Sequence, residues 1–110
     1  MERLRKNEDF QSVYKFGKSF ANKYFVIYVS KNQLDINRLG VSVSKKIGNS
    51  VVRHRMKRLV KETFRLRKDM SDSGLDIVVI IRKGAEELDN KAAVEALQSL
   101  MRILIHKYFS

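Results

Sequence analysis

The sequence of 110 residues contains no cysteine, and this absence removes several kinds of chemistry at once. Disulfide frameworks, thiolate zinc sites, iron–sulfur clusters and cysteine nucleophiles are all excluded. A chain without cysteine also fits a reducing cytosol, so we expect a cytoplasmic protein. There is no proline to mark a linker and no internal repeat. We therefore expect a single domain over residues 1–110.

Long apolar runs are also missing, although 44% of the residues are hydrophobic. The uninterrupted runs, such as the aliphatic run from Ile77 to Ile81, are far shorter than the roughly 20 residues of a membrane-spanning helix. The first ten residues, MERLRKNEDF, lack the apolar core of a signal peptide. We expect neither membrane insertion nor secretion, but a folded domain with a true hydrophobic core.

Acidic residues are scarce relative to basic ones: 12 Asp and Glu stand against 23 Lys and Arg, for a formal net charge of +11. The excess is concentrated in residues 45–68, which hold ten basic side chains and a single acid, Glu62. Such a charge on a small body favours a polyanionic partner, and the common polyanions are nucleic acid and acidic membrane.

Hydrophobic periodicity predicts an α+β fold with the element order α-β-β-β-α-β-α and a mixed central sheet packed with helices. Acidic residues in a first turn and a following glycine predict a first helix over residues 8–16, capped by Asn7 and ended by a left-handed Gly17. Residues 24–30 and 38–44 are expected to form two antiparallel strands, with a short strand near 18–21.

The continuous aliphatic run over residues 76–81 predicts a strand that is buried on both faces. A helix capped by Asp89 or Asn90 follows, with an apolar stripe that extends to Ile105. Residues 49–68 have helical period, with cations on one face. The opposite face is predicted to be buried and comprises Val52, Met56, Leu59, Val60, Thr63 and Leu66.

Many helices have a charged solvent face, but such faces normally alternate in sign, and this one does not. Like charges four residues apart, such as Lys57, Lys61 and Arg65, cost a few tenths of a kcal/mol per pair in an isolated helix. Phosphates from a partner would offset that cost. We therefore favour nucleic-acid binding over a merely solvated face.

The stretch SVSKKIGNSVVRHRMKRLVKE, from Ser42 to Glu62, resembles the signature of the bacterial ribonuclease P protein subunit family, close to GNxVxRNRxKRxxRE. Two further stretches resemble other parts of the family: KNEDFQSVYKFGKSFANKYFVIYV and DIVVIIRKGA. One departure lies inside the motif, where the family's central asparagine is His54. Both side chains can donate and accept a hydrogen bond, so a structural hydrogen bond could survive the exchange.

The resemblance implies a sheet flanked by helices, like domain 2 of a small-subunit ribosomal protein. Its β-α-β crossover around the basic helix would be left-handed, against the usual right-handed rule. It also implies a noncatalytic subunit of ribonuclease P, an RNA-based endonuclease that removes the 5′ leader of precursor tRNA with Mg²⁺. The Mg²⁺ would be held mainly by the catalytic RNA, and the protein would be a monomer in a 1:1 complex with that RNA. We expect no catalytic residue and no metal ligand in the chain, because His54 and His106 lie in different helices and no carboxylate cluster is present.

The resemblance implies two binding surfaces. The first would contact the catalytic RNA and comprises Arg53, His54, Arg55, Lys57, Arg58, Lys61 and Arg65. The second would hold the single-stranded leader and comprises Phe10, Tyr14, Val26, Tyr28, Ser42 and Ser44, with Lys45, Lys46, Arg82 and Lys83 at its rim. Without the resemblance, aromatic residues four apart on a helix would be assigned to the core.

Two alternatives remain open at this point. A structural RNA-binding protein of ribosomal type would bind precursor tRNA no better than mature tRNA. A basic helix that binds DNA is disfavoured, because the sequence has neither helix-turn-helix spacing nor a dimerising heptad.

Overall fold

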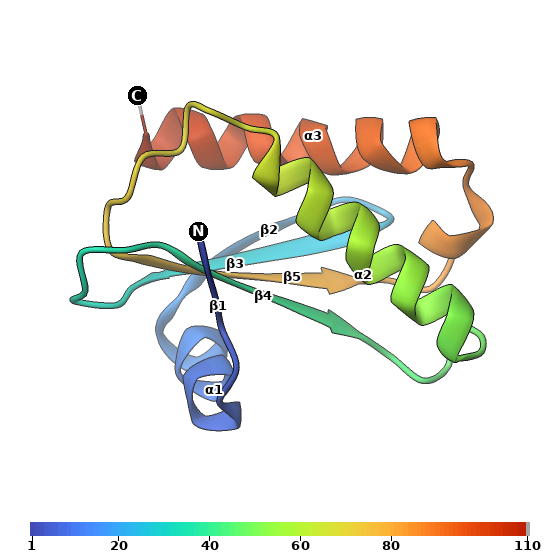
Figure 1. Cartoon of the computed structure of the whole chain (residues 1–110), viewed down its shortest axis with the longest axis horizontal. Helices are drawn as coiled ribbons and strands as arrows, with labels where there is room; N and C mark the ends of the chain where they lie inside the picture. The colour runs from blue at the N-terminus through green and yellow to red at the C-terminus, as the bar shows by residue number, and fades with distance from the viewer. Residues whose placement is uncertain (110) are drawn as a thin grey trace.

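The computed structural model describes residues 1–109 and contains a five-stranded mixed sheet flanked by helices (Figure 1). The elements are β1 Glu2–Arg3, α1 Asn7–Phe16, β2 Lys18–Ala21, β3 Phe25–Lys31, β4 Arg38–Val43, α2 Ser50–Arg65, β5 Leu75–Ile81, the 3₁₀ helix η1 Ala85–Glu87 and α3 Asn90–Tyr108. The α+β class and the predicted order are confirmed, with β1 as an additional short strand at the start.

One strand pairing was predicted wrongly. The strands predicted over 24–30 and 38–44 are present as β3 and β4, but they do not pair with each other. The order across the sheet is β1-β4-β5-β3-β2, so β5 lies between them, antiparallel to β3 and parallel to β4. The central place suits the aliphatic run of β5, because a central strand is covered on both faces.

The β4–α2–β5 unit forms the predicted crossover. Both strands point to the right in Figure 1, β4 lies in front of β5, and α2 passes above the sheet. With α2 toward the viewer and the strands pointing up, β5 would lie to the left of β4, so the crossover is left-handed, as the resemblance implied.

The helices cover the two faces of the sheet unequally. Helices α2 and α3 lie on one face and α1 on the other (Figure 1). The main core lies under α2 and α3 and includes Phe25, Met56 and Leu97, all fully buried. Helix α1 has ten residues and covers only part of the opposite face, where a small cluster forms around Val13 and Val78.

The helix ends follow the sequence with two exceptions. Asn49 caps α2 and Asp89 caps α3, each accepting a hydrogen bond from a backbone N–H in the first turn. Helix α1, however, begins at Asn7 and no side chain caps it. Gly17 is extended, with φ of −80°, and not left-handed. Glycine is needed there for another reason: a Cβ would lie 2.5 Å from the Val13 carbonyl oxygen.

Candidate nucleic-acid interface

The three aromatic residues of the predicted leader site form one cluster on the α1 face of the sheet. The Tyr14 ring meets the Tyr28 ring edge-on at 5.1 Å between centroids, and Phe10 lies 6.5 Å from Tyr14. All three side chains are half-buried, so each keeps part of its ring accessible. Burial, partly offset by a hydrogen bond with the Ser42 side chain, raises the pKa of Tyr14, so its hydroxyl stays protonated at neutral pH.

Beside this cluster, the same face of the sheet carries a row of half-buried side chains. The strand register places Val26, Ile80 and Ser42 side by side, one row beyond Tyr28 and Val78. A hollow of about 460 Å³ opens next to it, lined by Phe10, Tyr14, Gln11, Ser42 and Val43, together with Arg5, Asn7, Val41 and Lys57. We call this hollow and the row beside it the aromatic cleft.

The predicted rim residues gather at one end of the sheet, because β4 and β5 end there together and β3 begins there. Ser44, Lys45 and Lys46 form an exposed turn after β4, in which the Lys46 N–H donates to the Ser44 hydroxyl. Lys83 reaches across to the Lys46 carbonyl oxygen at 3.5 Å. Arg82 donates to the Asn22 carbonyl oxygen at 3.0 Å.

Two arginines of the α2 motif make hydrogen bonds within the protein. Arg53 donates to the Gly48 carbonyl oxygen at 2.7 Å and so holds the loop before α2. Arg55 donates to the Glu86 carbonyl oxygen and to the side chain of Asn90, which links α2 to the start of α3. Both guanidinium groups therefore stabilise the fold through these hydrogen bonds. Each also has further N–H groups that can donate to a phosphate.

The other motif residues divide between two sides of α2. His54 and Arg58 line a groove of about 590 Å³ between α2 and α3, whose walls include Leu59 and Val94. Arg58 takes part in none of the ion pairs among residues 1–109, although its charge, after that of Arg65, helps to lower the pKa of Glu62. Arg65 is paired with Glu62 at 2.8 Å.

Lys57 and Lys61 lie on the opposite side of α2, toward β1 and β4. Both are half-buried, because the buried face of α2 includes Phe64 and is rotated from the predicted one. Leu66, predicted to be on the buried face, is exposed because the helix ends at Arg65. Burial, followed by the nearby charges of Arg3 and Lys57, lowers the pKa of Lys61.

Several residues of this region were not among the predicted ones. Ile80 completes the row between Val26 and Ser42, and the period-two alternation of β5 would have found it had the strand order been known. Arg5, Asn7 and Gln11 line the aromatic cleft from the N-terminal segment and α1. No group of three or more His, Asp or Glu side chains that could hold a metal ion occurs within residues 1–109. In the same part of the chain, no helix is both long and apolar enough to cross a bilayer.

Residues 1–105 match the family model described as Ribonuclease P. The chain is 53% identical over 109 residues to the "Ribonuclease P protein component" of Lachnoclostridium phytofermentans, a match that covers 99% of this chain and 92% of that protein. It is 51% identical to the corresponding protein of Clostridium botulinum strain 657, with 91% of each chain covered.

Solved structures show the same similarity. The Staphylococcus aureus RNase P protein superposes with a TM-score of 0.89 at 38% identity, covering 100% of this chain and 99% of that one. The RNase P protein from Thermotoga maritima superposes with a TM-score of 0.79 at 42% identity, covering 91% and 94%.

Proposed function

The chain belongs to the ribonuclease P protein family, and from this premise we propose that it binds the catalytic RNA of ribonuclease P together with the 5′ leader of precursor tRNA. The RNA then removes the leader in a Mg²⁺-dependent endonucleolytic reaction, leaving the mature 5′ end of the tRNA. The protein acts as a monomer in a 1:1 complex with the RNA, in the cytoplasm. The role in tRNA processing follows from the family, whereas the binding surfaces and the division of labour are our proposal.

The observation that carries this proposal is the aromatic cleft beside the basic helix. Unpaired bases stack on aromatic side chains, at roughly 1–3 kcal/mol per base, while lysine and arginine follow the backbone. Phe10, Tyr14 and Tyr28 offer partly exposed rings, and Lys57 lies at the edge of the same hollow. A single strand therefore finds both kinds of contact in one place.

Within residues 1–109, no group of three or more His, Asp or Glu side chains offers a site for Mg²⁺. Two of the acids near the sheet, Asp9 and Asp76, contact the Arg38 guanidinium. We therefore assign the metal to phosphates of the RNA. The part of this chain is to bind and orient: the cleft holds the unpaired leader, and the exposed side of α2 contacts the folded RNA.

Reconstituted cleavage tests the proposal. Adding the protein to the cognate catalytic RNA at low Mg²⁺ and moderate salt should raise the rate of leader removal from precursor tRNA. The protein should also bind precursor tRNA more tightly than mature tRNA in the presence of the RNA, which a ribosomal-type protein would not do. Folded protein that fails to stimulate an active RNA would refute the proposal.

We expect Arg58→Gln to weaken binding to the catalytic RNA several-fold. Arg58 is exposed on α2 and takes no part in the ion pairs of residues 1–109, so its loss removes a phosphate contact and leaves the fold intact. The slope of log affinity against log salt should become less steep by about 0.7–0.9, the value for one phosphate. Filter binding over a salt series measures both quantities.

Arg102→Gln is the matched control, because it removes one exposed positive charge from α3. It should leave the affinity and the slope near the wild-type values. Equal losses in the two variants would indicate that only net charge matters and would contradict a specific role for α2.

A further inference from the structure

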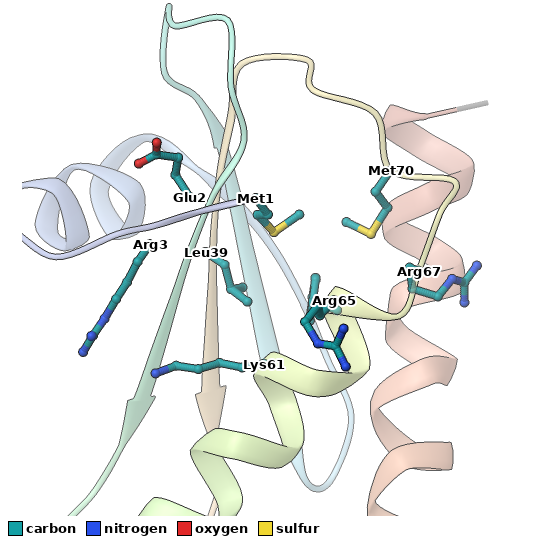
Figure 2. Close-up of a pocket in the computed structure, with 9 residues that line it drawn as sticks. Met1, Glu2, Arg3, Leu39, Lys61, Arg65, Arg67 and Met70 are labelled. Atoms are coloured by element: carbon teal, nitrogen blue, oxygen red, sulfur yellow. The ribbon is translucent and has the colours of Figure 1, made fainter.

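Another pocket lies between β1, the end of α2 and the segment that leads to β5 (Figure 2). Its volume is about 310 Å³. The floor is apolar, with Leu39 and Phe64 buried, and in Figure 2 the thioethers of Met1 and Met70 point toward each other across it. The rim holds four cations, Arg3, Lys61, Arg65 and Arg67, and one acid, Glu2, so its formal charge is positive.

The rim cations differ in how far they are already neutralised. Arg65 is paired with Glu62, and Arg67 with Asp69 at 2.6 Å. Arg3 and Lys61 belong to none of the ion pairs among the described residues. In Figure 2 the Lys61 ammonium extends toward the side of the pocket where the Arg3 side chain lies. These two groups are therefore available to an anion, whereas the apolar floor suits a flat, weakly polar group.

The pocket is continuous with the aromatic cleft. Arg3, Leu39 and Lys61 also line a neighbouring hollow of about 380 Å³, which in turn shares Arg5, Phe10, Val41 and Lys57 with the cleft. The connection follows β4, and among the described residues no strand pairs with its outer edge beyond Leu39. From Leu39 to Val43 the strand rises about 13 Å. We call this path along β4 the cationic lane.

Cations line both sides of the lane at regular intervals. Lys57 and Lys61 are one helical turn apart on α2, about 6 Å along its axis. Arg3 and Arg5, from the N-terminal segment, both line the connecting hollow. Burial lowers the pKa of Lys61, and the positive charges of Arg3 and Lys57 lower it further, which is consistent with repulsion among these three groups. Phosphates placed between the two rows would relieve that repulsion.

We propose that the leader of precursor tRNA continues from the aromatic cleft along the cationic lane, and that one unpaired base upstream of the cleft binds in the pocket of Leu39, Phe64 and Met70. The flat apolar faces of the base contact the floor of the pocket. The phosphates of the connecting RNA lie between Arg3 and Arg5 on one side and Lys57 and Lys61 on the other. The proposal rests on the proposed binding of the leader in the cleft, and it adds a second contact further upstream.

A series of precursors whose leaders grow by one nucleotide at a time tests this with the reconstituted holoenzyme. For the wild-type protein, affinity should rise in two steps, the first as the leader fills the cleft and the second as it reaches the pocket. Met70→Glu places a carboxylate beside the floor, so it should remove the second step, about tenfold in affinity, and keep the first. Met70→Leu preserves an apolar floor and should retain both steps.

A second variant keeps the test valid if Met70→Glu does not fold. Arg3→Gln changes an exposed side chain, and it should weaken only long-leader binding and reduce its salt slope by about 0.7. Lys18→Gln removes an equal charge from β2, at the opposite edge of the sheet, and should change neither step.

The outcomes separate this inference from the function on which it rests. Absence of even the first step in the wild type would refute leader binding itself. A first step without a second, or a second step unaffected by both Met70→Glu and Arg3→Gln, would overturn the upstream pocket alone. These variants could also weaken binding of the protein to the catalytic RNA alone, measured without precursor tRNA, enough to account for the whole loss. That result would assign the pocket to the catalytic RNA and would also overturn the inference.

Discussion

Phe10→Ala is expected to reduce the affinity of the reconstituted complex for precursor tRNA by roughly 5- to 150-fold, the range that corresponds to losing one stacked base. Binding of mature tRNA should stay nearly unchanged, because mature tRNA has no leader to occupy the cleft. The effect is expected to be large because Phe10 stands at the junction of two hollows, the aromatic cleft and the cationic lane. Equilibrium binding of the two tRNAs, measured side by side, gives the ratio directly.

Two variants distinguish stacking from packing. Phe10→Leu keeps an apolar side chain against Gly40 but has no ring, so we expect it to fold normally and still lose most of the discrimination between the tRNAs. Phe16→Leu removes an aromatic side chain from the same helix, where it is 71% exposed and outside the cleft, and should retain full discrimination. Equal losses for precursor and mature tRNA in Phe10→Leu would contradict the leader cleft.

Gly40→Ala provides an independent route to the same result. A Cβ at Gly40 would lie 2.5 Å and 2.7 Å from two carbon atoms of the Phe10 ring, so the ring must move although no atom of it is deleted. We expect this variant to lose leader discrimination with only a modest loss of stability, since the half-buried ring can swing outward. Unchanged discrimination would show that the position of the ring is not important.

Much of the fold was predictable because its elements have strong local signals. The aliphatic run of β5 predicted a strand that is buried on both faces. Asn49 and Asp89 are residue types that commonly cap helices, and they are the N-caps of α2 and α3. The strand order was not predictable from the same signals. Periodicity identifies each strand, but which strands become neighbours depends on the path of α2 across the sheet.

The roles of the cations were harder to predict than their positions. Helical phase places Arg53 and Arg55 on the flanks of the basic face, but it carries no information about nearby backbone carbonyls. The carbonyl oxygens of Gly48 and Glu86 accept hydrogen bonds from these arginines only because the loops fold back toward α2. For the same reason the pocket around Met70 was not predicted, since its walls come from three distant segments of the chain.

Arg38→Leu is expected to destabilise the protein by about 3 kcal/mol, the largest stability effect that we predict for a single polar side chain. The Arg38 guanidinium contacts both carboxylate oxygens of Asp76, at 2.6 Å and 2.7 Å. The Asp76 side chain is 8% exposed, and without Arg38 its remaining side-chain donor is Asn32. Breaking one partner of a buried pair typically costs 3–5 kcal/mol, and the lower end applies because Arg38 itself is 21% exposed.

Urea denaturation measures this loss, which at an m-value of about 1.5 kcal/mol per M would lower the midpoint by about 2 M. The double variant Arg38→Leu with Asp76→Leu removes the stranded charge together with its partner, so it should be more stable than Arg38→Leu alone. A double variant no more stable than the single one would contradict this explanation.

The same guanidinium approaches Asp9 of α1 at 3.5 Å and so connects the helix that carries Phe10 to the sheet. As urea is added to Arg38→Leu, discrimination between precursor and mature tRNA should therefore decline before the protein unfolds globally. In variants that weaken only the α2 and α3 side of the core, the discrimination and the folded structure should be lost together.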